Sequence, residues 1–582
     1  MAANRGIQYI PAIDGLRAIA VIAVVLYHLG ISWIPGGFLG VDLFFVISGY
    51  VITRLLLDSI QRSGGLDLRG FYLARVRRLL PPLVFMVVTS AIAIGLWAPD
   101  TIKRFLTDTP FALTGTMNWW LVYHQQDYFE TIGRPPLLQH TWSLAVEAQF
   151  YLIWPLILLL VVKYFGKKQI SRAALLIALV SGISLLLLSL RLDSSDVSKI
   201  SHVYFGTDTH SIGLFLGAAL AVSWVPQNLK TVVSRRAQDF IDAIGTIGFL
   251  GLLATFLLID ETNPALYRLA FPLAGVLGCA ILLSIVHPAS RFAPILQSRA
   301  LLWIGERSYA IYLWHWVIFQ VTRPSVDLAG NSWALFLLRI LIVFALADIS
   351  LRWVELPIRS GALSYWFQGR KYRAKNARRR QRATVGIASL ALLLTLAGVS
   401  IRALSINNIE EVALRKSLEA TPGSTSRNVN NNGLWVTGDS VILGIRSALT
   451  AHAHIGLINA RVGRQAPELL DVMVRDIKSA PKSTVIFNLG NNNILTHAEV
   501  LSIFEVIKNQ PKIIVVNTAV PRPWRDANNA LIALVAARYA NAFIVDWSSI
   551  STNHPEYFAP DGVHLAPAGA AIYVGAIVKV LG

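Results

Sequence analysis

The chain has 582 residues, of which 54% are hydrophobic and 15% charged, and its formal net charge is +19. Soluble domains carry roughly a quarter charged residues, so this composition excludes an ordinary soluble protein and also disordered and collagen-like chains. Despite the positive charge it excludes a nucleic-acid-binding protein, and a membrane protein of two or more domains remains. The single cysteine, Cys279, lies in an apolar run, so disulfides and CxxC metal sites are excluded and no metal is expected.

Eleven apolar runs predict membrane-spanning helices, because a hydrocarbon core about 30 Å thick needs about 20 apolar residues of helix. The runs lie near residues 18–34, 38–57, 79–98, 141–163, 173–190, 210–226, 240–260, 267–287, 300–321, 334–354 and 384–402. A further run, 105–123, is short and holds Asn118 and a tryptophan pair, which indicates an interfacial or re-entrant segment. The first run leads into the second without a small-residue cleavage site, so we do not expect a signal peptide.

Clusters of Lys and Arg separate these runs and predict the orientation of the chain. They lie at residues 62–78, 163–172, 230–236, 291–299 and 359–382. If all of these clusters are cytoplasmic, the spans alternate correctly from an internal N-terminus, provided that 105–123 does not cross. The last run then ends outside, so we expect a multi-pass plasma-membrane protein with an extracytoplasmic C-terminal domain.

Beyond the last run the sequence changes character. A polar linker is followed by β-branched runs that alternate with helical periods, which predicts an α/β domain with a parallel sheet. The expected strands are 434–438, 484–490, 512–518 and 541–547, and the expected helices lie near 441–451, 466–479, 497–509, 526–540 and 566–581. The chain therefore divides into a membrane domain at 1–360, a basic loop with an eleventh helix at 361–403, a linker at 404–433 and the α/β domain at 434–582.

Ionisable residues lie inside several apolar runs, where they are costly and mark functional sites by default. Arg17 and His28 are eleven residues apart, which places both on one helix face about 16 Å apart along the axis. A histidine that is merely hydrogen-bonded inside the bundle remains the alternative for His28. Arg75 and Arg78 lie one helical turn apart and could hold a phosphate between them, although a positive-inside boundary also explains them. Further ionisable residues in or beside these runs are Asp14, Asp42, Glu147 and His315.

Five segments of the membrane half resemble, in order, the signatures of acyltransferase family 3. They are DGLRAIAVIAVVLYH (14–28), GGFLGVDLFFVISGY (36–50), FYLARVRRLLPP (71–82), HTWSLAVEAQFYLIWP (140–155) and SYAIYLWHW (308–316). The resemblance covers about residues 8–360 and implies an integral-membrane acyltransferase with about ten spanning helices plus one linking helix. It implies that cytoplasmic acetyl-CoA is the donor and that His28 is essential for moving acetyl across. Donor binding would involve Arg17, Arg75 and Arg78, and Glu147 matches an acid that is typical of the family. Asp14, Asp42, Glu147 and His315 are expected to be supporting residues.

In the C-terminal domain, Ser440 follows the first strand and opens a helix, at the place where open α/β sheets bind ligands. A serine at that position is alternatively a plain helix cap. Asp561 and His564 lie three residues apart before the last helix and could serve as orienter and base for one serine. The expected oxyanion donors are the N–H of Ser440, the N–H of Gly463 and the amide of Asn492. Each of these residues could separately be part of an ordinary turn. Together, however, they occur in the expected order at the ends of the strands.

These blocks resemble the SGNH hydrolase and acyltransferase superfamily over about residues 434–582. The resemblance implies a flavodoxin-like three-layer domain in which Ser440 is the nucleophile, His564 the base and Asp561 its orienter. Many relatives carry Asp where this chain has Asn493, a departure that bears on the support of the loop. With both halves in this order, the chain resembles the peptidoglycan O-acetyltransferases of the OatA type.

The resemblance implies an O-acyltransferase that carries acetyl from cytoplasmic acetyl-CoA to a hydroxyl of a cell-envelope glycan, expected to be O6 of N-acetylmuramic acid in peptidoglycan. Its partners would be acetyl-CoA, the glycan and the lipid bilayer, with no bound cofactor and no nucleic acid. One alternative is the same enzyme acting on an exopolysaccharide or a glycolipid. A second is a tethered extracellular esterase. A third is an envelope transporter or flippase, which would not need Ser440.

Overall fold

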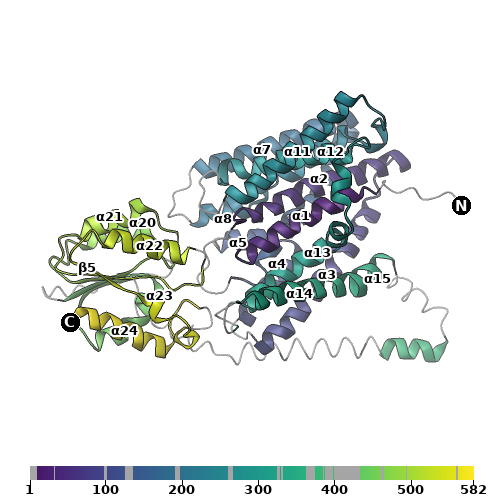
Figure 1. The fold of residues 1–582 in the computed structure, drawn as a ribbon. Helices are drawn as coiled ribbons and strands as arrows, with labels where there is room; N and C mark the ends of the chain where they lie inside the picture. The colour runs from purple at the N-terminus through teal and green to yellow at the C-terminus, as the bar shows by residue number, and fades with distance from the viewer. Residues whose placement is uncertain are drawn as a thin grey trace.

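The computed structural model describes residues 9–31, 33–97, 101–124, 135–190, 197–259, 266–323, 328, 332–361, 374–383, 386, 398, 433–460, 464–492, 494–522, 524–558 and 562–582. Figure 1 shows that the N-terminal half is a helical bundle and that the C-terminal domain is a sheet covered by helices. Apart from positions 386 and 398, the eleventh apolar run lies outside the described residues, as does nearly all of the linker, so both stay predictions.

Long apolar helices build the bundle. The longest are α1 Pro11–His28, α2 Gly40–Ser63, α3 Leu68–Trp97, α6 Trp142–Phe165, α7 Ile170–Leu190, α11 Arg235–Leu258, α12 Phe271–Val286, α13 Arg299–Val321 and α14 Trp333–Ile349. Eight helices among the described residues are long and apolar enough to cross a membrane. Two more expected spans are the 23-residue α13, whose first half carries charges, and the shorter α10 Ile212–Ser223. Shorter helices at their ends are α8 Val197–Phe205, α9 Thr207–His210 and α15 Leu356–Arg359.

Residues 105–123 fall into two short helices and do not form one span. α4 covers Ile102–Thr114 and α5 covers Met117–Tyr123, and Gly115 between them ends α4 with a φ of 71°. At 1.5 Å per residue the two helices are roughly 20 and 10 Å long. Neither reaches across a hydrocarbon core about 30 Å thick, which agrees with the prediction that this segment does not cross.

α1 packs against α2 and α13, and glycines set how closely α1 and α13 approach. A Cβ built at Gly305 would lie 2.0 Å from the main-chain oxygen of Asp14. A Cβ at Gly15 would lie 1.8 Å from the main-chain oxygen of Leu296, in the segment that precedes α13. Small residues commonly let membrane helices touch through their backbones. The contacts therefore fix the register of α13 along α1.

The C-terminal domain holds a five-stranded parallel sheet in the order β2-β1-β3-β4-β5. The strands are β1 Leu434–Gly438, β2 Ile455–Ala460, β3 Val485–Asn488, β4 Ile513–Val516 and β5 Ala542–Val545. One face is covered by α20 Ala466–Asp476, α21 His497–Ile507 and α22 Arg525–Ala536, and the other by α19 Ser440–Thr450, α23 Trp547–Ile550 and α24 Pro567–Leu581 (Figure 1). The three layers and this strand order confirm the predicted flavodoxin-like fold.

Strand β2 is absent from the sequence-based prediction, whereas the four expected strands and five expected helices all form. Its sequence, IGLINA, includes Gly456 and Asn459, and only Leu457 among its residues is buried. The strand pairs with β1 alone and lies at the edge of the sheet. An edge strand needs no continuous apolar run, so the pattern that identifies the buried central strands does not find it.

Candidate functional site

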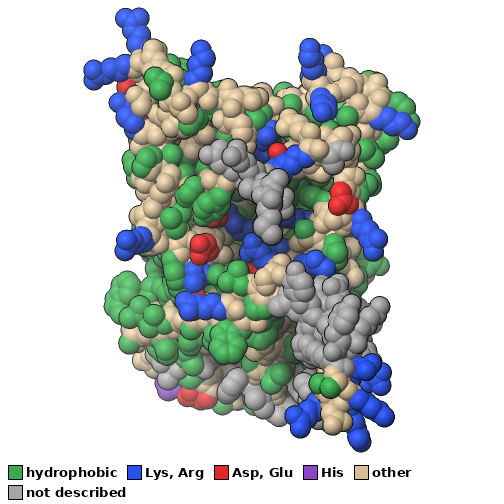
Figure 2. All heavy atoms as spheres, turned by 90° about the vertical axis from the view of Figure 1, so that its right-hand side faces the viewer, with side chains coloured by type: hydrophobic (Ala, Val, Ile, Leu, Met, Phe, Trp, Pro, Cys, Tyr) green, Lys and Arg blue, Asp and Glu red, His purple; other side chains and the backbone are tan. Residues whose placement is uncertain are grey.

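A cavity of about 810 Å³ lies among α1, α2, α3, α6 and α13. Five arginines contribute to its wall from α1, α2, α3 and α15, namely Arg17, Arg54, Arg75, Arg78 and Arg359. Figure 2 shows Lys and Arg side chains around and within a hollow on one face of the bundle. Pockets of this size bind small molecules, and the arginines suit an anionic one.

Arg75 and Arg78 differ from Arg17 and Arg359 in their surroundings. Arg17 lies 3.5 Å from a carboxylate oxygen of Asp14, and Arg359 lies 3.0 Å from one of Glu355. By contrast, no carboxylate within the described ranges lies at ion-pair distance from Arg75 or Arg78. The buried Nε of Arg75 has no hydrogen-bond partner among the residues that the structure describes. An anion that enters the cavity would therefore not have to displace a carboxylate from these two side chains.

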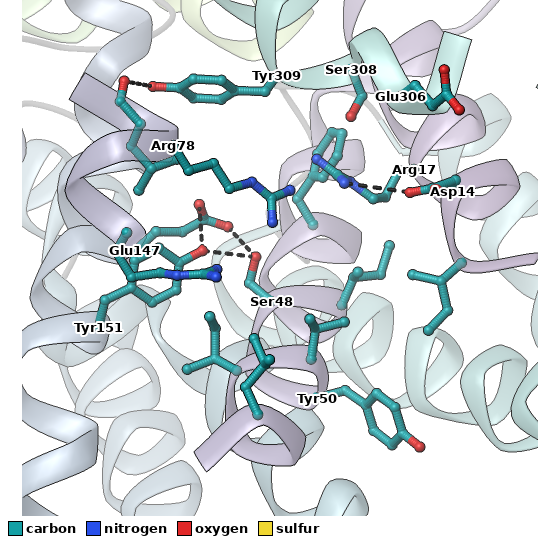
Figure 3. Close-up of a pocket in the computed structure, with 18 of the residues that line it drawn as sticks. Asp14, Arg17, Ser48, Tyr50, Arg78, Glu147, Tyr151, Glu306, Ser308 and Tyr309 are labelled. Atoms are coloured by element: carbon teal, nitrogen blue, oxygen red, sulfur yellow. Dashed lines mark hydrogen bonds and ion pairs between the residues drawn. The ribbon is translucent and has the colours of Figure 1, made fainter. Parts of the chain in front are cut away.

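Glu147 also lines the cavity, and each of its two carboxylate oxygens accepts a hydrogen bond from a hydroxyl group (Figure 3). Ser48 Oγ donates to Oε1 at 2.6 Å, and Tyr151 OH donates to Oε2 at 3.2 Å. The structure thus brings together in one cavity the three predicted donor-binding arginines and two of the predicted supporting residues. These are Asp14, Arg17, Arg75, Arg78 and Glu147.

His28 lies at the far end of α1 from Arg17, as the eleven-residue spacing predicts. It is the last residue of the helix and does not line the cavity. Its Nδ1 lies 3.1 Å from Nε2 of His315 on α13. The ring of His140 lies 5.9 Å from that of His315, measured between centroids, so three histidines form a cluster. The predicted residues therefore separate into an arginine-lined cavity and a histidine cluster further along the bundle.

Asp42 takes part in neither group. Its Oδ1 lies 3.0 Å from Nε2 of His210, whose Nδ1 lies 2.6 Å from the main-chain oxygen of Tyr204. Both Asp42 and His210 are buried, and the ring of Phe271 lies against His210. The structure therefore places Asp42 in a buried pair that connects α2 to α9, away from the cavity wall.

Ser440 is the first residue of α19 and directly follows the turn after β1, as predicted. The main-chain N–H of Val441 donates to Asp439 Oδ1 at 2.9 Å, so Asp439 caps the start of the helix. Ser440 Oγ makes no hydrogen bond to any residue that the structure describes, and Ser440 is 1% exposed. The alternative of a plain serine cap therefore does not account for Ser440.

Asp439 accepts hydrogen bonds from three amide side chains at the end of β3 and just after it. Asn488 donates to its Oδ1 at 2.6 Å, and Asn491 and Asn492 each donate to its Oδ2 at 2.9 Å. Burial raises the pKa of the Asp439 carboxyl, while these donors and the nearby charge of His564 oppose that rise. Asn492 therefore lies beside the serine turn, and its amide donates both to Asp439 and, at 3.2 Å, to the main-chain oxygen of Arg464. To act as the expected oxyanion donor, Asn492 would have to release one of these two acceptors.

The remaining predicted residues of the serine site in the C-terminal domain lie before α24 and after β2. His564 stands in the loop that precedes α24, close enough for its charge to act on Asp439. A cavity of about 10 Å³ lies beside Val441, lined among others by Asn491 and Tyr573, and it has room for about one water molecule. Gly463, Asp561 and Asn493 lie outside the described residues, so their roles stay predictions.

Sequence reasoning missed several polar residues that the structure places at these sites. Arg464 is one: its Nη1 donates to the main-chain oxygens of Gly438 at 3.1 Å and Asn459 at 2.6 Å, and so ties the end of β1 to β2. His140 lies in a quoted motif without an assigned role. His210 is the first residue of the apolar run 210–226, and this position is the only signal that points to it. The others are Asp439, Asn488 and Asn491.

Comparison with known proteins gives concordant matches for both halves. The acyltransferase domain profile matches residues 10–352. The chain is 34% identical to the peptidoglycan O-acetyltransferase OatA of Listeria monocytogenes, over 99% of this chain and 98% of the relative. It is 31% identical to the putative peptidoglycan O-acetyltransferase YrhL of Bacillus subtilis (99% and 98%) and to the O-acetyltransferase OatA of Staphylococcus aureus (99% and 96%). The solved C-terminal catalytic domain of Streptococcus pneumoniae OatA, with a methylsulfonyl adduct, is 26% identical, with 26% of this chain and 92% of that chain covered and a TM-score of 0.23.

A helical membrane half with an acyltransferase match, joined to an α/β domain with a serine at its sheet edge, defines a membrane-bound O-acyltransferase. The chain belongs to acyltransferase family 3, and its relatives align with it across both domains.

Substitution of Asp439 by Asn is expected to destabilise the C-terminal domain and lower its activity. One of the two oxygens becomes an NH₂ group, so either Asn488 and Val441 or Asn491 and Asn492 lose their acceptor. Each buried donor left without an acceptor costs about 1–3 kcal/mol. We expect Asp439→Asn to reduce hydrolysis of p-nitrophenyl acetate by the full-length protein more than tenfold, and to accelerate proteolysis on heating. Asp471→Asn, at an exposed site on α20, is the control, and wild-type behaviour of Asp439→Asn would contradict the expectation.

Proposed function

We propose that this enzyme transfers acetyl from acetyl-CoA on the cytoplasmic side of the membrane to peptidoglycan on the outer side, at O6 of N-acetylmuramic acid. The observation that carries the proposal is the similarity to relatives named as peptidoglycan O-acetyltransferases, because it spans both domains. The two candidate sites supply the two halves of such a reaction, a donor site in the membrane and a serine beyond it.

The arginine-lined cavity supports an anionic donor. CoA carries phosphate groups, and guanidinium groups bind phosphate through paired, charge-assisted hydrogen bonds. Arg75 and Arg78 lie on its wall with no described carboxylate at ion-pair distance. Acetyl itself is small and uncharged, so a relay that passes only acetyl avoids moving the phosphates through hydrocarbon.

The histidine cluster supports a step inside the bundle. His28 lies eleven residues, and so about 16 Å, beyond Arg17 on the same helix. A neutral imidazole can accept a proton or take an acetyl group itself. His28 would therefore act between the donor cavity and the acceptor side.

In the C-terminal domain, Ser440 Oγ attacks the carbon of an acetyl group delivered by the membrane domain and passes its proton to His564. The bond between the acetyl carbon and its donor group then breaks, and His564 gives this proton to the departing donor group, which leaves an ester on the serine and His564 neutral. The glycan hydroxyl then attacks this ester and gives its proton to His564, which returns it to Ser440 as the O–C bond breaks. The transient oxyanion in each step is held by the N–H of Ser440. Gly463 and Asn492 are the further donors, and Asp561 orients His564.

A sided assay tests the proposal. Right-side-out membrane vesicles that contain the full-length protein receive labelled acetyl-CoA inside or outside, with cell-wall fragments outside. We expect labelled ester acetate on muramic acid O6, identified by mass spectrometry, only when acetyl-CoA is inside. Label with external acetyl-CoA alone would contradict the direction, and label on other polysaccharides but not on muramic acid would contradict the acceptor.

Substitution of Arg75 or Arg78 by Gln is expected to raise the KM for acetyl-CoA roughly 10- to 100-fold. The estimate follows from about 1.5–3 kcal/mol for a hydrogen bond to a charged group. Initial rates at varied acetyl-CoA give KM and kcat separately. Arg69→Gln, at an exposed position of the same helix α3, is the matched control and should leave KM unchanged. Equal KM values in all of these proteins would exclude Arg75 and Arg78 from donor binding.

A further inference from the structure

The ring of His315 is held at both nitrogens. Its Nδ1 lies 2.6 Å from the main-chain oxygen of Tyr312, one turn earlier in α13, and its Nε2 lies 3.1 Å from Nδ1 of His28. The side chain is 0% exposed. A carbonyl oxygen can only accept a hydrogen bond, so Nδ1 carries the single proton of neutral His315 and Nε2 is left as an acceptor.

This assignment determines the tautomer of His28. Because Nε2 of His315 accepts, the hydrogen between the two rings belongs to Nδ1 of His28. The contact with His315 therefore places the proton of neutral His28 on Nδ1 and its lone pair on Nε2.

We propose that His315 is a positioning residue that holds His28 with Nδ1 protonated, so that Nε2 is the reacting atom. The proposal rests on the proposed function in so far as His28 takes part in acyl transfer. If Nε2 takes the acetyl group, the Nε2–C bond forms as the C–S bond of the thioester breaks, and the electron pair leaves with the sulfur. The ring of His28 then carries a positive charge, which the acceptor behind Nδ1–H stabilises. An orienting group behind a catalytic imidazole has the same role in serine hydrolases.

The backbone contacts between α1 and α13 explain why these two rings meet. The close approach at Gly305 fixes the register of α13 along α1 at the arginine end of the helix. His315 lies ten residues, and so about 15 Å, further along α13. His140 does not compete with His28 for Nε2 of His315, because Nε2 of His140 lies 3.1 Å from the main-chain oxygen of Leu313.

Two substitutions of His315 separate positioning from packing. The amide oxygen of Gln reaches the place of Nε2 and keeps an acceptor for His28, whereas Leu fills the space without one. We expect His315→Leu to lower kcat for acetyl-CoA-dependent transfer by the full-length protein 10- to 100-fold, the usual effect of losing an orienting partner. The KM for acetyl-CoA should not change, and His315→Gln should keep most of the activity. Equal losses in both variants would overturn the positioning role.

The tautomer is tested separately by ¹⁵N NMR of histidine-labelled full-length protein in liposomes. His28→Gln assigns the signals, and we expect His28 with a protonated Nδ1 and an unprotonated Nε2. A protonated Nε2 would overturn the inference whether or not transfer is observed. If the wild-type protein transfers no acetyl, the proposed function fails while the spectrum still decides the tautomer.

Discussion

Replacement of Ser440 by Ala is expected to abolish transfer of acetyl to the outer glycan in a protein that still folds. Loss of a catalytic nucleophile lowers rates by roughly 10⁴- to 10⁶-fold. Stability should change little, because Asp439 accepts the N–H of Val441 and the helix cap survives the substitution. The measurement is ester acetate on muramic acid in cells that lack the protein and carry either the wild type or the variant.

Ser479→Ala, at an exposed position after α20, is the matched control and should restore wild-type acetate. Methanesulfonyl fluoride, which modifies nucleophilic serines, should label the Ser440 peptide of the wild type and of this control. Normal acetate with Ser440→Ala would exclude the serine and favour a transport role. An increase in acetate on deletion of the whole protein would indicate an esterase.

Replacement of His28 by Gln is expected to stop acetyl-CoA-dependent transfer while the outer domain keeps its own chemistry. Loss of a general base or an acyl-accepting imidazole should reduce the rate about 10²- to 10⁴-fold. Hydrolysis of p-nitrophenyl acetate, which does not need the membrane domain to deliver acetyl, should remain at the wild-type rate. This is the opposite of the pattern expected for Ser440→Ala, in which both activities are lost.

His124→Gln is the control for this variant, because His124 is an exposed histidine of the membrane half outside the three-histidine cluster. It should keep both activities. Loss of p-nitrophenyl acetate hydrolysis in His28→Gln would indicate misfolding, and unchanged transfer would show that His28 is a structural histidine of the bundle.

Local sequence patterns predict features that depend on a single element. The change from a β-branched run to a helical period places Ser440 at its turn, and the eleven-residue spacing places Arg17 and His28 about 16 Å apart along one helix. The RxxR spacing likewise puts Arg75 and Arg78 on one cavity wall. Periodicity alone is sufficient in these cases, because each relation lies within one helix or one strand–helix junction.

Contacts between distant segments could not be predicted in this way. The pairing of His28 with His315 joins residues 287 positions apart and depends on backbone contacts at glycines of α1 and α13. The pair of Asp42 and His210 joins residues 168 positions apart. Helical periodicity gives the face of each residue but not the register of one helix against another, so the sequence contains these residues without indicating their partners.

The low exposure of Ser440 has a kinetic consequence. An acetyl ester on a serine that is 1% exposed has little contact with bulk solvent. Spontaneous loss of acetyl to water should therefore be slow, and the ester should persist until a sugar hydroxyl enters the site. The same burial that limits access would thus favour transfer over hydrolysis and let the outer domain act as a short-term store of activated acetate.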